Sequence, residues 1–93
     1  MNNYLNFPKS IFLGIINPFN PTTTIEYEIP GRSKVEVKIY DLLGREIQNL
    51  VNEEQEAGVY QIRFDGSKLS SGIYLYTLKT GNNEETKQMI LLR

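Results

Sequence analysis

The sequence contains neither cysteine nor histidine among its 93 residues. Without cysteine the chain has no disulfides and no thiolate ligands for metals, and without histidine it lacks the commonest general base. The glycines stand singly rather than in a phosphate-binding loop, and no nucleophile is paired with a base. We therefore predict a non-enzymatic chain with no cofactor and no metal site.

The chain also lacks a surplus of one charge and a long apolar run. Its 10 Lys and Arg against 11 Asp and Glu give a net charge of −1, whereas nucleic-acid binding needs a basic face. No segment approaches the roughly 20 apolar residues of a membrane-spanning helix. The apolar residues 11–16 are too few for a signal peptide and precede no small-residue cleavage site. We expect residues 1–16 to be an atypical leader or an added edge strand.

What the chain does contain is a repeated alternation of apolar and polar residues, interrupted by turn residues. No window shows the apolar stripe of a helix. A slip in the alternation after Asn49 predicts a bulge or bend. Six or seven short strands at about ten-residue spacing predict an all-β fold, an immunoglobulin-like antiparallel β-sandwich. The expected strands are residues 24–29, 34–39, 45–52, 60–65, 73–80 and 86–93.

Three connections between strands carry more specific predictions. Residues 41–44 are expected to close a hairpin, with Gly44 in the left-handed position of a type I turn with a G1 bulge and Asp41 capping it. Residues 52–58 are expected to form a polar loop, and residues 81–84 a turn.

The triplet Gly-X-Tyr occurs twice, as Gly58-Val59-Tyr60 and Gly72-Ile73-Tyr74. A glycine at a strand entrance followed by tyrosine is typical of the tyrosine corner in immunoglobulin-like domains, where the hydroxyl bonds nearby backbone. We therefore expect both rings to pack in the core with their hydroxyls hydrogen-bonded, rather than to stack on a ligand.

Two Asn-Pro steps, at residues 17–18 and 20–21, hold the backbone extended before the first clear strand. Phe19, between the prolines, is expected to pack onto the sandwich edge. The residues to which we assign structural roles are Asn17, Pro18, Phe19, Asn20, Pro21, Gly44, Gly58, Tyr60, Gly72 and Tyr74.

Residues 17–93 as a whole resemble the type A C-terminal sorting domain of the type IX (Por) secretion system. The resemblance rests on four segments in this order: NPFNPTTTI (17–25), VKIYDLLGREI (37–47), LSSGIYLY (69–76) and KQMILLR (87–93). It implies an immunoglobulin-like sandwich that acts as a C-terminal secretion signal behind a large N-terminal cargo protein, which this chain lacks. Its implied partners are the outer-membrane translocon and a sortase-like peptidase that removes the domain. The implied route runs through the periplasm to the cell surface or the outside.

Residues 89–92 are apolar at both odd and even positions, so both faces of the last strand are apolar, although a strand of a sandwich buries only one face. We therefore expect the last strand to be the recognition site. We expect the odd-numbered face to point outward, so that Met89 and Leu91 meet a partner by strand addition, and Ile73 and Leu75 join them in one patch. The predicted recognition residues are Lys87, Met89, Leu91, Leu92 and Arg93. The same strand also allows weak self-association.

Four alternatives remain open at this point. In the first, residues 11–16 cover Met89 and Leu91. In the second, the charges of Lys87 and Arg93 protect a sheet edge from aggregation. The chain would be an adhesive or carbohydrate-binding module, with Tyr40, Tyr74 and Tyr76 as a stacking platform. Or it would be a structural module like the C-terminal domain of flagellar hook-capping proteins.

Overall fold

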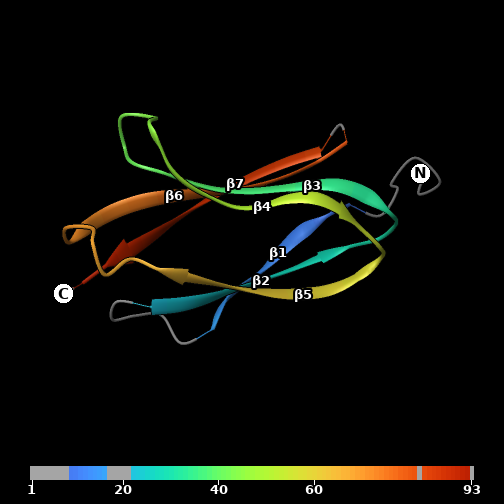
Figure 1. The fold of residues 1–93 in the computed structure, drawn as a ribbon, viewed down its shortest axis with the longest axis horizontal. Helices are drawn as coiled ribbons and strands as arrows, with labels where there is room; N and C mark the ends of the chain where they lie inside the picture. Colours follow the sequence, from blue (N-terminus) through green and yellow to red (C-terminus); the bar gives the residue numbers. More distant parts are fainter. Residues whose placement is uncertain (1–8, 17–21, 82, 93) are drawn as a thin grey trace, which may run out of the picture.

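Our computed structural model describes residues 9–16, 22–81 and 83–92 and contains seven strands (Figure 1). They are β1 (Ile11–Ile16), β2 (Thr22–Ile29), β3 (Ser33–Tyr40), β4 (Glu46–Gln55), β5 (Gly58–Asp65), β6 (Gly72–Thr80) and β7 (Asn83–Leu91). In these segments no helix is long and apolar enough to cross a membrane.

The strands form two antiparallel sheets that pack face to face (Figure 1). One sheet has the order β1-β2-β5 and the other β4-β3-β6-β7. The turn at residues 30–32 carries the chain from one sheet to the other, and β2 and β3 each pair with a strand later in the sequence. The predicted all-β sandwich is confirmed, with seven strands. The predicted strand 24–29 corresponds to β2, and residues 11–16 form the edge strand β1.

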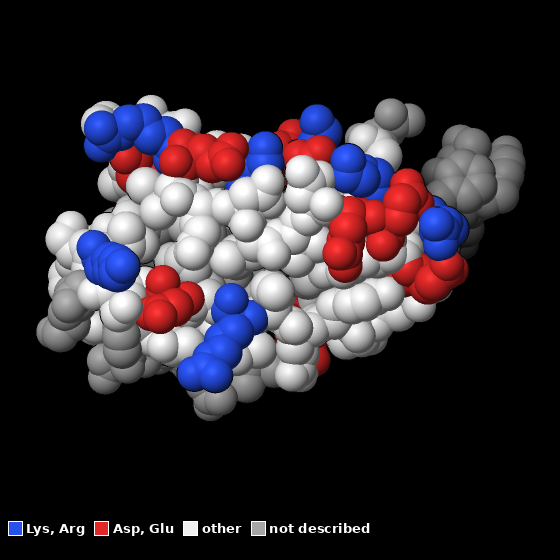
Figure 2. Space-filling view, in the orientation of Figure 1, with Lys and Arg blue, Asp and Glu red and all other residues white. Residues whose placement is uncertain are grey.

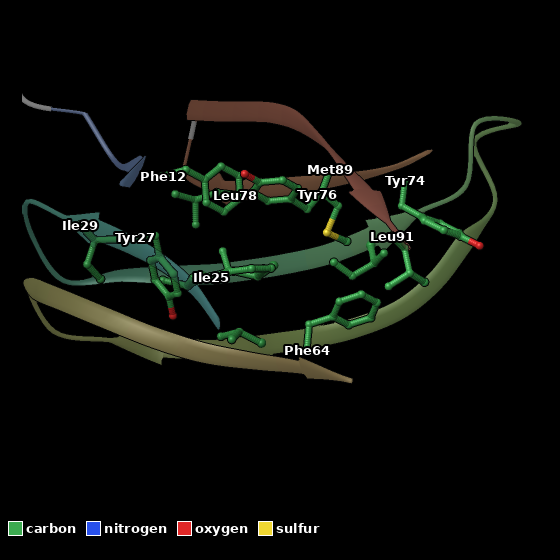
Figure 3. Close-up of a cluster of buried hydrophobic side chains, with 14 residues drawn as sticks. Phe12, Ile25, Tyr27, Ile29, Phe64, Tyr74, Tyr76, Leu78, Met89 and Leu91 are labelled. Carbon is green, nitrogen blue, oxygen red and sulfur yellow. The ribbon is translucent and has the colours of Figure 1, made fainter. Parts of the chain in front are cut away.

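The core lies between the sheets and follows the predicted alternation. Its fully buried side chains come from β2, β3, β5 and β6, and burying each large one contributes about 1.5–3 kcal/mol. Phe12 of β1 and Met89 and Leu91 of β7 belong to the same cluster (Figure 3). The largest fully buried side chains are Tyr27, Phe64, Ile25, Ile29, Ile39, Leu78, Val35 and Val37.

The turn between β3 and β4 has the predicted geometry. Gly44 has a φ of 86°, which favours glycine, and its N–H donates to the Asp41 carbonyl at 3.0 Å. The Asp41 carboxylate accepts hydrogen bonds from the backbone N–H groups of Leu43 and Arg45, both at 2.9 Å. These bonds, chiefly the one from the Arg45 backbone, lower the pKa of Asp41.

The predicted irregularity in β4 is confirmed, but the predicted loop at residues 52–58 is wrong. Val37 pairs with Val51 and Lys38 with Asn49, so Leu50 is the extra residue of a bulge. Residues 52–55 continue β4 and pair with β3. Polar residues are tolerated there because β4 is an edge strand, whose outer side faces solvent.

Both tyrosines of the Gly-X-Tyr triplets make the predicted hydrogen bond to backbone. The Tyr60 hydroxyl donates to the carbonyl of Glu56, and the Tyr74 hydroxyl donates to that of Ser70, each at 2.7 Å. Each acceptor lies four residues upstream of its ring, so the two triplets build the same local structure. The predictions for Asn17, Pro18, Phe19, Asn20, Pro21 and Arg93 concern residues outside the described segments.

Candidate functional site

The described strands leave four sheet edges, and β7 forms the least protected of them. β1 and β4 are interrupted by register shifts, which disfavour the addition of a further strand. The ladders of β5 with β2 and of β7 with β6 are regular. However, β5 ends in the exposed charges Arg63 and Asp65, whereas residues 88–92 carry no charge. The second half of β7 is therefore a regular, uncharged edge.

The predicted orientation of this strand is wrong, because the odd-numbered face points inward. Met89 is 8% exposed and Leu91 is 5% exposed, and both point between the sheets (Figure 3). The reason is the pairing of β7 with β6: Met89 lies opposite Tyr74, and directly opposed residues share a face. Tyr74 is itself buried.

The exposed apolar side chains at this end of the chain are instead Ile90, on the outward face of β7, and Leu92, the residue after the strand, each 61% exposed. Lys87 lies on the same face of β7 as Met89, yet it is exposed, because a long charged side chain at a sheet edge can reach solvent. Of the predicted recognition residues, the structure thus leaves Lys87 and Leu92 accessible and removes Met89 and Leu91 from direct contact.

Ile90 and Leu92 belong to a larger apolar surface on the outer face of the four-stranded sheet. Ile73 lies directly opposite Ile90 and is exposed, and Leu75, half-buried, pairs with Tyr40 of β3 on the same face. We call Ile73, Ile90 and Leu92 the outer patch. The exposed Leu42 and Leu43 lie in the β3–β4 turn, which Figure 1 places at the same end of the sandwich as the end of β7.

The cation Lys38, on the outer face of the four-stranded sheet, is paired with two carboxylates. Lys38 lies two residues before Tyr40 on the same face, and its Nζ lies 3.4 Å from Glu46 and 3.5 Å from Glu36. On the face of the molecule seen in Figure 2, Lys and Arg alternate with Asp and Glu, and neither sign forms a continuous stripe. The outer patch itself is made of three apolar residues and is therefore suited to an apolar partner surface rather than to a polyanion.

The structure contradicts the alternative of a tyrosine platform for sugars. Tyr74 and Tyr76 are 8% and 3% exposed and lie in the core, whereas Tyr40 lies on the outer face. Rings on opposite faces of one sheet cannot stack on one sugar. The open depression lined by Ile47, Gln48, Asp65, Ser67, Lys68 and Leu69 contains no aromatic ring. The described residues also contain no group of three side chains that could hold a metal ion.

Sequence reasoning missed Ile90 as an exposed residue, although a signal for it was present. The Gly-X-Tyr triplet predicts that Tyr74 packs in the core, and a turn of two or four residues places Met89 opposite a residue on the same face as Tyr74. The charges at Lys87 and Arg93 suggested the opposite parity. Cross-strand pairing, not the charge at a strand's ends, decides which face is buried.

Comparison with known proteins identifies the family of this chain. The family profile described as a secretion system C-terminal sorting domain matches residues 17–92, most of the chain. No curated protein and no solved structure matches. The chain therefore belongs to the secretion system C-terminal sorting domains, the non-catalytic sorting signals of the type IX system, which interact with its machinery and send proteins to the cell surface or out of the cell.

Proposed function

We propose that the type IX translocon in the outer membrane recognises this domain through the second half of β7 and the outer patch. The observation that carries the proposal is the exposed pair Ile73–Ile90 beside a regular, uncharged sheet edge. In an antiparallel ladder, alternate residues of an edge strand turn their backbone N–H and C=O groups away from the neighbouring strand. A partner strand would bond to these groups and bury the outer patch at the same time.

Lys87 and Arg93 flank this segment and supply the charged contacts, while Met89 and Leu91 act indirectly by anchoring β7 to the core. Residues 17–93 are the domain that is recognised, and residues 1–16 are an added segment that ends in the edge strand β1. The cargo, fused before the domain, passes through the periplasm to the surface or the outside. A sortase-like cysteine peptidase then removes the domain.

The test is export of a fluorescent reporter that carries a signal peptide and ends in the complete chain, in a host with the type IX system. The variant Ile90→Thr with Leu92→Thr removes apolar surface while leaving the core intact. We expect the exported fraction to fall about tenfold, since a few apolar anchors dominate such interfaces. Val59→Thr is the matched control, because Val59 is 55% exposed on β5, away from the outer patch.

Wild-type export by the Val59→Thr fusion is expected. If the double variant is folded and exported as well as the wild type, the outer patch is not the recognition surface. If the wild-type fusion itself stays in the periplasm, the chain does not act as a sorting signal in that host.

A further inference from the structure

Strand β1 lies outside the range matched by the family, residues 17–92, yet it completes the core. Phe12 is 4% exposed, and its ring meets Tyr76 edge-on, with centroids 4.6 Å apart and planes at 63°. Ile15 packs against the same cluster. Aromatic pairs in this geometry stabilise beyond the area that they bury. Removing β1 would therefore uncover Tyr76 and leave β2 as a sheet edge.

The start of β1 is also bound to the opposite sheet by polar contacts. The Thr80 hydroxyl donates to that of Ser10 at 2.6 Å, and both side chains are buried. The Asn83 amide donates to the Ser10 carbonyl at 2.9 Å, and the Phe12 N–H donates to the Glu85 carboxylate at 2.7 Å. All three partners belong to the β6–β7 hairpin. The segment is thus held by β2 on one side and by this hairpin on the other.

A bulge gives β1 a specific sequence requirement. Phe12 pairs with Tyr27 and Gly14 with Glu26, so Leu13 is the extra residue, and its side chain is exposed. Gly14 has a φ of 134°, which L side chains rarely adopt. Because the bulge shifts the parity, Phe12 and Ile15 both face the core although they are three residues apart.

We propose that residues 22–92 form a strand-acceptor site that selects an extended segment by sequence, and that residues 9–16 are its occupant. The site takes a hydroxyl side chain at the Ser10 position, an aromatic ring two residues later and a glycine two residues after that. Its polar side is made by Thr80, Asn83 and Glu85. The site accepts the same segment from a separate peptide once the resident strand is weakened. This inference does not depend on the proposed role in export.

The test uses the complete chain with Phe12→Ala, which weakens the resident strand, and a fluorescent peptide spanning residues 9–16. We expect saturable binding by fluorescence anisotropy, and binding about tenfold weaker when the peptide carries Gly14→Ala or Phe12→Ala. The matched control chain is Leu13→Ala, whose altered side chain is exposed, so its own strand stays in place and excludes the peptide. A folded Phe12→Ala chain that binds no peptide, or binds the Gly14→Ala peptide equally well, overturns the proposal.

Amide hydrogen exchange of the complete chain with Ser10→Ala gives a second test that holds even where Phe12→Ala does not fold. Loss of the Ser10 hydroxyl leaves Thr80 without its acceptor. We expect amides of residues 22–29 and 83–86 to exchange about tenfold faster, with those of residues 46–55 unchanged. An unchanged pattern, or an equal acceleration throughout the sandwich, contradicts a site localised between β2 and the β6–β7 hairpin.

Discussion

Ile73 and Ile90 lie directly opposite each other across β6 and β7, and both point to solvent, with exposed fractions of 39% and 61%. Side chains directly opposite each other on one face of an antiparallel pair are close enough to interact, and such contacts stabilise the pairing of the strands. The same pair in a monomer leaves apolar surface uncovered at the end of a sheet whose last strand is an edge. The Ile73–Ile90 pair thus stabilises the β6–β7 hairpin and forms the centre of the outer patch.

The first prediction is that Ile73 and Ile90 act as one recognition surface. Ile73→Thr keeps β-branching and removes part of the apolar surface, so we expect it to reduce export of the reporter fusion as Ile90→Thr does. Because the residues are in contact, the double variant should lose less than the sum of the two single effects. The free energy of unfolding, measured by denaturant titration, should change by no more than about 0.5 kcal/mol for each single variant.

Additive losses for the two single variants would show that Ile73 and Ile90 contact separate partners. Normal export by a folded Ile73→Thr fusion would restrict recognition to β7.

The second prediction follows from the corrected orientation of β7. Met89→Ala removes a buried side chain from the core and should lower the free energy of unfolding by about 2–4 kcal/mol, measured by denaturant titration. Gln88→Ala is the matched control on the neighbouring, exposed position, and we expect a change below about 0.5 kcal/mol. Equal effects of the two substitutions would mean that Met89 is not part of the core.

The sequence predicted the parts of the fold that depend on local chemistry. Gly44 and Asp41 specify their turn because glycine tolerates a positive φ and a carboxylate accepts backbone N–H groups. The alternation at Ile25, Tyr27 and Ile29 specified a buried face, and the break after Asn49 specified a bulge. These features need no knowledge of which strands pair.

The features that the sequence did not predict depend on contacts between distant segments. Met89 points inward because it lies opposite Tyr74 in the neighbouring strand, fifteen residues earlier in the sequence. Residues 52–55 are extended because they pair with β3. Burial of Phe12 needs Tyr76 and Glu85 from the opposite sheet. Polarity along the chain cannot report such pairings, so Met89 and Leu91 were assigned to the wrong face of their strand.

A third prediction concerns the two corner tyrosines. Tyr74→Phe removes a hydroxyl that donates to the Ser70 carbonyl, in a residue that is 8% exposed, and should cost about 0.5–1.5 kcal/mol of unfolding free energy. Tyr60→Phe removes the equivalent bond to Glu56 at a more exposed site, where water replaces it, so its cost should be smaller. Thermal or denaturant unfolding of the two variants measures the difference, and a larger loss for Tyr60→Phe would contradict this order.

The last prediction concerns pH and the turn at Asp41. Hydrogen bonds from the Arg45 and Leu43 backbones, together with the Arg45 side chain, lower the pKa of the Asp41 carboxyl below its ordinary value of 3.8. A group with a lowered pKa in the folded state stabilises the fold above its unfolded pKa, and this contribution is lost as pH falls through the folded pKa. The Asp41 contribution should therefore be complete at neutral pH and disappear below about pH 3.8.

Asp41→Asn isolates this contribution because it keeps the shape of the side chain and removes the charge. We expect the wild type to be the more stable protein at pH 7, and the difference in unfolding midpoint to shrink as the solution is acidified towards about pH 2. Asp65, whose carboxylate accepts the Ser67 N–H at 2.9 Å and whose pKa is also lowered, is present in both proteins. Its effect cancels in the comparison, so a difference that stays constant with pH would show that the Asp41 charge does not stabilise the turn.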